Sequence, residues 1–244
     1  MIRFLRPFDP RRLRLLVFDL DGTLIDSRLD LIHSVNAMLR HIQRPELEGD
    51  VIASYVGDGA PTLVRRALGD TADQALLERA MEYFLVYYRQ HKLDHTTVYE
   101  GIPEVLARLA NSPHGAESNG VPPDGVPPNG APRQMAVLSN KPVNPSRQIV
   151  QALGMGDFFV CVYGGNSFTT KKPDPLGVRT IMQETGVAAD ETLIIGDSAV
   201  DVLTGRNAGL WTCGVTYGFA PHSLQQTPPD VLVESPRELG ELLR

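Results

Sequence analysis

The stretch LLVFDLDGTLIDS (residues 15–27) places two acids directly behind four consecutive apolar residues. A continuous apolar run of this kind predicts a strand that is buried on both faces. Asp19 and Asp21 leave such a strand on the same side, because side chains alternate along an extended chain. Gly22 then permits a turn in which backbone N–H groups face an anion. Neighbouring carboxylates are tolerated where a cation and an anion lie between them, so this stretch predicts a site for a metal ion and a phosphate.

Four further apolar runs predict strands of the same kind. They are MAVLS (135–139), FVCVY (159–163), TLII (192–195) and WTCGVTY (211–217). Helical patterns lie between these runs, and Gly209 is the expected C-cap of the helix that follows the TLII run. The alternation of strands and helices predicts an α/β fold with a Rossmann-like, doubly wound parallel sheet.

The region behind the first strand breaks this alternation. Apolar residues recur there at helical spacing, and Ser27 is the expected N-cap of the first helix. We therefore expect a helical cap domain at residues 26–94, inserted into a core that is formed by residues 1–25 and 95–244. The chain enters and leaves the core at neighbouring points, so this cap could hinge as a lid.

Residues 111–133 differ from the rest of the predicted core. They contain a degenerate repeat, NGVPP-DGVPP-NGAP, and no apolar periodicity. Asn-Gly, Asp-Gly and proline favour turns and oppose packed structure. We expect a flexible Pro/Gly-rich loop between a helix and a strand.

Polar residues also follow the other predicted strands. Ser139 and Asn140 come at the end of the MAVLS run, and Lys172 lies in the loop after the FVCVY run. Asp197 follows the TLII run, with Asp201 one helical turn later. Because the carboxyl ends of parallel strands meet at one edge of a sheet, we expect these side chains to converge with the two acids of the first strand.

These four motifs together resemble the haloacid dehalogenase superfamily. LLVFDLDGTLIDS, MAVLSN, KPDP and LIIGDSAVD occur in the order that marks this family, and the helical insert resembles a C1-type cap. The stretches SNKP and GVTYG make the chain most similar to the phosphoglycolate phosphatase branch. The resemblance covers residues 14–220.

The resemblance implies a role for each motif residue in the transfer of a phosphoryl group. Asp19 would be the nucleophile that forms an aspartyl-phosphate, and Asp21 the general acid and base. Ser139 and Asn140 would bind the phosphoryl oxygens. Lys172 would neutralise the charge of the phosphate and the nucleophile.

The same resemblance implies Mg²⁺ as the cofactor. Asp19, Asp197 and the backbone carbonyl of Asp21 would be its protein ligands. Asp201 is expected to orient Lys172 or a metal-bound water rather than to bind the metal.

Two assignments depend on weaker patterns. Lys171 and Lys172 are adjacent, and we choose Lys172 because it begins the K-P-x-P pattern. Asp58 lies in a glycine-rich loop of the cap and is the candidate for a contact between cap and active site.

The predicted function is a Mg²⁺-dependent phosphatase that acts on a small phosphorylated metabolite such as 2-phosphoglycolate. One alternative is a phosphomutase of the β-phosphoglucomutase type, in which a sugar hydroxyl replaces water. Another is a non-enzymatic, receiver-like phospho-signalling domain, which the helical insert disfavours because a lid suits catalysis. Asp21 disfavours dehalogenase chemistry, since an acid there serves phosphate-ester cleavage. The substrate and the oligomeric state stay open.

Composition excludes several other classes of protein. The chain has 244 residues and a net charge of −6, so we expect neither a nucleic-acid nor a membrane partner. Its two cysteines lack CxxC spacing and its six histidines are scattered, so no zinc site is expected. The basic N-terminus lacks the apolar core of a signal peptide. It is expected to be a surface arm of a cytoplasmic protein.

Overall fold

The computed structural model describes residues 1–69, 73–111 and 133–244. A seven-stranded sheet forms its centre, in the order β1-β9-β8-β7-β2-β5-β6. Every neighbouring pair is parallel except β1 and β9, which confirms the predicted doubly wound parallel sheet. The strands span Arg3–Phe4 (β1), Leu15–Phe18 (β2), Gln134–Leu138 (β5), Cys161–Tyr163 (β6), Thr192–Gly196 (β7), Trp211–Val215 (β8) and Val231–Val233 (β9). The predicted loop at 111–133 lies, but for its two end residues, outside the described residues.

Two neighbouring strands, β1 at the edge of the sheet and β9 beside it, were not predicted from the sequence. The N-terminal arm forms β1, in which Arg3 pairs with Leu232 and Phe4 with Val231 of β9. Both residues of β1 are exposed, so neither an apolar run nor alternation marks this strand. The arm therefore closes the sheet with an antiparallel edge instead of lying beside it.

Helices cover both faces of the sheet, because alternate residues of β2 point to opposite sides. Leu16 and Phe18 pack in one apolar cluster and Leu15 and Val17 in another. The first cluster includes residues of α5 (Ile102–Asn111), α6 (Val143–Ala152) and α10 (Pro236–Leu242). The second face is covered by α7 (Leu176–Thr185) and α8 (Ala199–Ala208). Gly209 ends α8 in the left-handed conformation, which confirms its predicted C-cap position.

Short helices complete the core. They are α9 (Ser223–Gln226) and three 3₁₀ turns at Pro10–Arg12, Gly156–Phe158 and Ala189–Glu191. Within the described residues, no helix is both long enough and apolar enough to span a bilayer.

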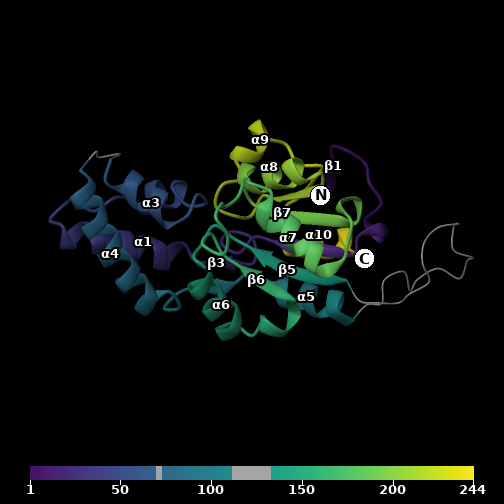
Figure 1. The fold of residues 1–244 in the computed structure, drawn as a ribbon, viewed down its shortest axis with the longest axis horizontal. Coiled ribbons are helices and arrows are strands. Elements are labelled where there is room, and N and C mark those ends of the chain that lie inside the picture. Colours follow the sequence, from purple (N-terminus) through teal and green to yellow (C-terminus); the bar gives the residue numbers. More distant parts are fainter. Residues whose placement is uncertain (70–72, 112–132) are drawn as a thin grey trace, which may run out of the picture.

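Four helices form a separate lobe at one end of the molecule, whereas both termini lie on the core (Figure 1). They are α1 (Arg28–His41), α2 (Gly49–Ser54), α3 (Ala60–Ala67) and α4 (Gln74–His91). Their inward faces make an apolar cluster of their own, with Phe84 and Tyr88 of α4 among its largest members. Each large apolar side chain buried in this way stabilises the lobe by about 1.5–3 kcal/mol.

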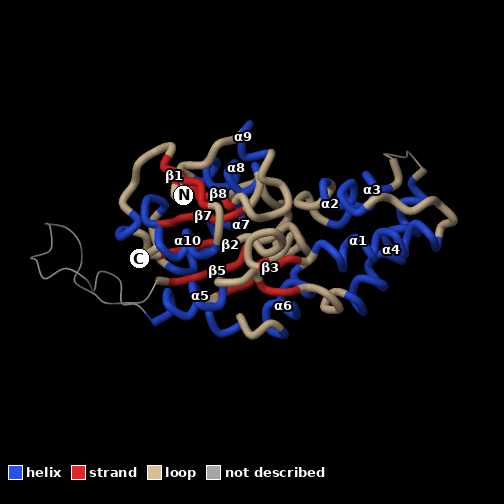
Figure 2. Tube along the Cα trace, turned by 180° about the vertical axis from the view of Figure 1, so that it is seen from behind, coloured by secondary structure: helices blue, strands red, loops and turns tan. Residues whose placement is uncertain are grey.

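A two-stranded antiparallel ribbon lies at the root of this lobe. It pairs β3 (Ile25–Asp26) with β4 (Thr97–Val98), where the chain leaves the core and returns to it. In Figure 2 the lobe beyond the ribbon contains only helices and loops. We propose this ribbon as the boundary between the core and the 26–94 cap.

Ser27 stands at the predicted N-cap position of α1 but does not cap the helix. Its hydroxyl makes no bond to the first turn of α1 and instead donates to Asp21 Oδ1 at 2.5 Å. The side chain is therefore part of the strand-end site, because the turn after β2 brings residue 27 back over residue 21.

Candidate active site

The carboxyl ends of three adjacent strands bring the first site residues together. Val137 of β5 and Ile195 of β7 flank Phe18 in the parallel register. Asp19 continues the ladder, with its backbone N–H donating to the carbonyl of Ile195 at 2.8 Å. Ser139 and Asp197 come next on the neighbouring strands, so the predicted convergence at this edge is what the parallel register produces.

Asp19 is buried and held from two sides. Its Oδ1 accepts from the backbone N–H of Leu20 at 2.7 Å and lies 3.0 Å from Lys172 Nζ. Burial raises the pKa of Asp19 to about 6. The positive charge of Lys172 lowers this pKa in part, and the negative charge of Asp201 raises it further. No described residue bonds Oδ2, which is the oxygen available to an incoming group.

Lys172 is buried between two carboxylates. Its Nζ lies 2.6 Å from Asp201 Oδ1 and 3.0 Å from Asp19 Oδ1. Burial opposes its charge, but the combined attraction of Asp19 and Asp201 raises the pKa of Lys172 above its usual value. The lysine therefore stays cationic at the point where a phosphate would meet Asp19.

Asp197 is the third buried acid. Its Oδ2 accepts from the backbone N–H groups of Phe219 and Ala220 at 2.6 and 3.2 Å. Burial, followed by the charges of Asp201 and Asp19, raises the pKa of Asp197 to about 8. Gly22, at φ +80°, packs so tightly here that a Cβ would lie 2.2 Å from Asp197 Oδ2. Only glycine fits at this turn.

Three carboxylates form a cluster that suits a divalent cation. One oxygen from each of Asp19, Asp197 and Asp201 lies within 4.8 Å of the others, and all three residues are buried. One lysine cannot balance three acids, and Mg²⁺ prefers oxygen ligands. Both oxygens of Asp201 already have partners, Lys172 and the Ser198 hydroxyl, as expected for a residue that orients Lys172.

Asp21 is not part of this cluster and lines a cavity. Its carboxylate accepts from the Ser27 hydroxyl and lies 2.9 Å, through each oxygen, from Lys141 Nζ. Lys141 is a site residue to which the sequence analysis assigned no role. The available signal is its position directly after Ser139 and Asn140. Burial opposes its charge, but Asp21 raises the pKa of Lys141 above the usual range.

The cap reaches the same pair through Tyr88 of α4. Lys141 Nζ lies 4.7 Å from the centroid of the Tyr88 ring, within the range of a cation–π contact. The Tyr88 hydroxyl is buried without a hydrogen-bond partner among the described residues. Burial raises the pKa of Tyr88 to about 12, so its hydroxyl stays neutral and can donate.

Asn140 joins core and cap in this structure. Its Nδ2 donates to the carbonyls of Gly57 and Lys172, each at 3.1 Å. Both amide hydrogens are thus used, so the side-chain amide holds the cap loop and the Lys172 segment. The Ser139 hydroxyl lies nearer the cavity floor, where it accepts from the backbone N–H of Lys141 at 3.3 Å.

The two adjacent lysines have different surroundings. Lys172 lies in the acid cluster, whereas Lys171 reaches the cap and donates to the backbone carbonyl of Asp58. The Asp58 carboxylate turns to Arg66 at 2.7 Å instead of the active site. The cap loop therefore contacts the core through its backbone, and Gly59 permits this because a Cβ there would lie 2.9 Å from the carbonyl of Asn140.

A cavity of about 380 Å³ separates the strand ends from the cap. On the core side it is lined by Asp19, Asp21, Ser139, Asn140 and Lys141. On the cap side its lining includes Leu31, Val56, Leu63, Phe84, Tyr88 and Arg89. The Arg89 guanidinium has no acidic partner within residues 1–69, 73–111 and 133–244. The cavity therefore has a charged floor on the core side and, among the described residues, a mostly apolar roof with one cation on the cap side.

Known proteins are similar to this chain in sequence and in fold. The chain is 34% identical to a phosphoglycolate phosphatase from Chromobacterium violaceum over 96% of its own length and 98% of that protein. It is 36% identical to a phosphoglycolate phosphatase from Pseudomonas putida over 84% of its length and 70% of that protein. A crystal structure described as a predicted phosphoglycolate phosphatase from Haemophilus somnus superimposes with a TM-score of 0.82 at 25% identity, covering 96% of this chain and 99% of that one. The sequence model of the haloacid dehalogenase-like hydrolases matches residues 13–209, so the expected relationship is confirmed and the chain belongs to that family.

Proposed function

We propose that this protein is a Mg²⁺-dependent phosphatase that hydrolyses a small phosphate monoester, 2-phosphoglycolate, through an aspartyl-phosphate on Asp19. The observation that carries the proposal is the buried Asp19–Lys172–Asp201 arrangement, in which Asp19 lines the cavity and Lys172 lies directly behind it. It places a carboxylate oxygen of Asp19 that can attack phosphorus beside the Lys172 ammonium, which attracts the negative phosphate. The relatives named phosphoglycolate phosphatase support the choice of reaction.

The first step transfers the phosphoryl group to the protein. Asp19 Oδ2 attacks phosphorus and forms the new P–O bond, while the bond from phosphorus to the alcohol oxygen breaks. Lys172 attracts the phosphoryl oxygens from beside Oδ1, and the Ser139 hydroxyl donates to one of them. Asp21 enters this step protonated and gives its proton to the departing alcohol oxygen, so that the alcohol leaves neutral and Asp21 becomes the carboxylate that pairs with Lys141.

The second step restores the nucleophile. A water attacks phosphorus on the aspartyl-phosphate, and Asp21 takes the proton that this water loses. The bond between phosphorus and Asp19 breaks, which releases inorganic phosphate and regenerates the carboxylate. Lys141 and Ser27 hold Asp21 toward the cavity, where it can reach both the alcohol and the water.

The three-acid cluster would hold the metal ion. Asp19 and Asp197 are the proposed side-chain ligands, together with the backbone carbonyl of Asp21. When bound, Mg²⁺ supplies positive charge that reduces repulsion between the nucleophile and the phosphate, which is about 4 kcal/mol per charge pair in a partly dry site.

The cavity supports a substrate with a second negative charge. Arg89 is the one cation of its cap-side lining and has no acidic partner in the described part of the chain. A phosphate ester bound to the floor would present the far end of its alcohol to the roof. A carboxylate there, as in phosphoglycolate, would pair with Arg89 in a bidentate contact.

A panel of phosphorylated metabolites, assayed for released phosphate with Mg²⁺, tests the proposal. We expect the highest kcat/KM for 2-phosphoglycolate, and multiple turnovers without any added bisphosphate. Turnover that depends on a sugar bisphosphate would instead support a phosphomutase. A single phosphorylation of Asp19 without turnover would support a receiver-like domain.

A further inference from the structure

We infer that Asp30, His33 and His95 form a binding site for a transition-metal ion at the root of the cap. One ligand atom from each residue lies within 4.8 Å of the others. The site is separate from the acid cluster, which contains only carboxylates. Its two nitrogen donors give it a different preference among metals.

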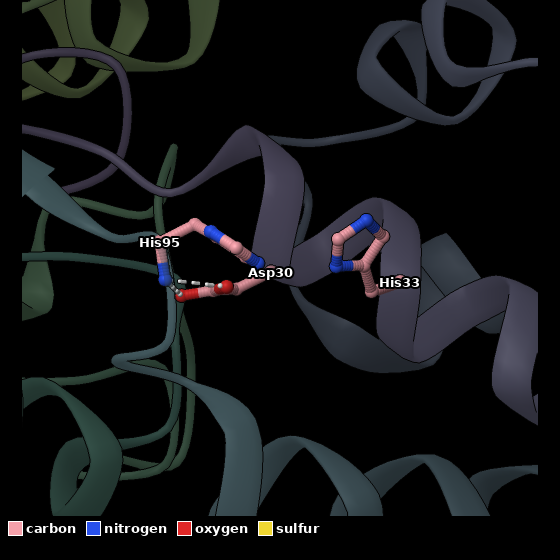
Figure 3. Close-up of side chains that lie close together, drawn as sticks. All are labelled: Asp30, His33 and His95. Atoms are coloured by element: carbon pink, nitrogen blue, oxygen red, sulfur yellow. Dashed lines mark hydrogen bonds between the residues drawn. The ribbon is translucent and has the colours of Figure 1, made fainter.

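The three residues lie on the two segments that connect the core with the cap, and the fold brings these segments together. Asp30 and His33 lie three residues apart in the first turns of α1 and therefore share a face of that helix. His95 lies between α4 and β4, on the segment that returns to the core. In Figure 3 the Asp30 carboxylate is directed toward His95, and the His33 ring lies beside it, farther along α1. The imidazole centroids are 5.2 Å apart, with the rings at 80°.

Asp30 is already held in place as a ligand would be. Its Oδ2 accepts from the backbone N–H and the hydroxyl of Thr96, at 2.9 and 2.7 Å. Its Oδ1 accepts from the backbone N–H of His95 at 3.0 Å, which leaves a lone pair on that oxygen. Hydrogen bonds of this kind orient metal-binding carboxylates in known sites. The same bonds tie the returning segment to α1.

The two imidazoles are the exposed part of the site. Both histidines are exposed, and no ring nitrogen of either is hydrogen-bonded within the described residues. Ligand atoms around a tetrahedral Zn²⁺ lie roughly 3.3–3.5 Å apart, given metal–ligand bonds of about 2.0–2.2 Å. The ligand atoms start within 4.8 Å of one another, and a metal ion would draw the exposed rings to the shorter separation by rotation of their side chains.

The donor set favours Zn²⁺ over Mg²⁺. Imidazole nitrogen suits zinc, nickel and copper, whereas magnesium selects oxygen. Two nitrogens and one carboxylate leave a fourth position for water, as in three-ligand zinc sites. A bound ion would join the start of α1 to the segment that returns to the core. It would therefore link the two segments that connect the core with the cap.

Zn²⁺ binding to the full-length protein, stripped with a chelator, tests the inference. Titration against a chromophoric chelator is run with excess Mg²⁺, which keeps the acid cluster occupied. We expect one equivalent of Zn²⁺ on the unaltered protein, and at least a tenfold weaker affinity in His33→Ala and in His95→Ala, about the loss seen when metal sites lose supporting groups. Co²⁺ in place of Zn²⁺ is expected to show visible absorption bands in the unaltered protein alone.

Two controls separate this site from others. His222→Ala removes another exposed histidine and is expected to leave the equivalent unchanged. Asp19→Asn changes the acid cluster and is also expected to keep it. The thermal midpoint in EDTA checks that each variant folds. The inference is overturned if the double variant His33→Ala/His95→Ala binds Zn²⁺ as tightly as the unaltered protein, or if the unaltered protein binds none at micromolar concentrations.

Discussion

The core wall of the cavity is charged and tightly paired, whereas the cap wall is almost entirely apolar. Asp19 and Asp21 of the core each face a buried lysine within 3.0 Å. Among the described residues of the cap, Arg89 is the one cation that lines the cavity. Its guanidinium has no acidic partner in the described part of the chain. Removal of one partner of a buried ion pair lowers the free energy of unfolding by about 3–5 kcal/mol, whereas removal of an exposed charge changes it little. The difference indicates that chemistry is built into the strand ends and that selection is built into the roof.

The largest expected effect comes from the core wall. Asp19→Asn keeps the shape of the side chain but removes the nucleophile, so we expect kcat to fall by about 1000-fold or more with the fold retained. Phosphate release from the preferred ester measures it, and circular dichroism checks the fold. Asp26→Asn is the matched control, because that acid pairs with Arg28 in the same motif and does not line the cavity. Similar losses in both variants would contradict a special role for Asp19.

Lys141 tests whether the pairing of Asp21 matters. Lys141→Met keeps much of the volume but removes the cation that holds Asp21 toward the cavity. We expect kcat to fall by about 100-fold, at the low end of what general acid–base catalysis contributes. Lys171→Met is the control, since that lysine donates to the cap backbone at Asp58 and not to Asp21. If both variants keep full kcat, Asp21 needs no partner and the core wall is less tightly organised than its contacts indicate.

Arg89 tests selection by the cap wall. In Arg89→Ala we expect KM for 2-phosphoglycolate to rise about tenfold, through loss of a charge-assisted contact worth 1.5–3 kcal/mol or so. Activity on p-nitrophenyl phosphate, which lacks a carboxylate, should not change. Arg79→Ala on the same helix is the control, because Arg79 is exposed and absent from the lining. Equal loss on both substrates would move Arg89 out of the selection role.

The smallest expected effect is on stability. Burial raises the pKa of Asp19 to about 6 and of Asp197 to about 8, above the ordinary value of 3.8. Protonation of these acids therefore stabilises the metal-free fold below pH 4 or so, and this contribution is lost as the pH rises toward 8. Mg²⁺ binds the ionised acids, so it should raise Tm more at pH 8 than at pH 5, by about 2–4 °C for each kcal/mol of binding free energy. Calorimetry with and without Mg²⁺ measures this, and an equal gain at both pH values would contradict it.

Much of the strand-end site is predictable from local patterns. A buried parallel strand that ends in a polar residue delivers it to one edge of the sheet, whatever the intervening sequence. Asp19, Ser139 and Asp197 converge for this reason, and Lys172 joins them through the loop pattern that begins with it. The helical spacing behind the first strand is equally local, and it indicates an insert that makes its own apolar cluster.

The contacts between distant segments could not be predicted from the sequence. Nothing in the pattern around Lys141 shows that it pairs with Asp21, or that Tyr88 of the cap covers it, because both contacts depend on how the cap closes over the core. Ser27 reads as a helix cap, yet the turn after β2 directs its hydroxyl to Asp21.

The sequence by itself determined the fold class, the helical segment behind the first strand and the strand-end acids, since each follows from periodicity or from the order of residues along a strand. Only the tertiary structure decided which side chains meet across the domains. His33 and His95 look unrelated in the chain, and the closing of the β3–β4 ribbon brings them beside Asp30. Long-range contacts of this kind arise from packing of whole elements, which no short stretch of sequence records.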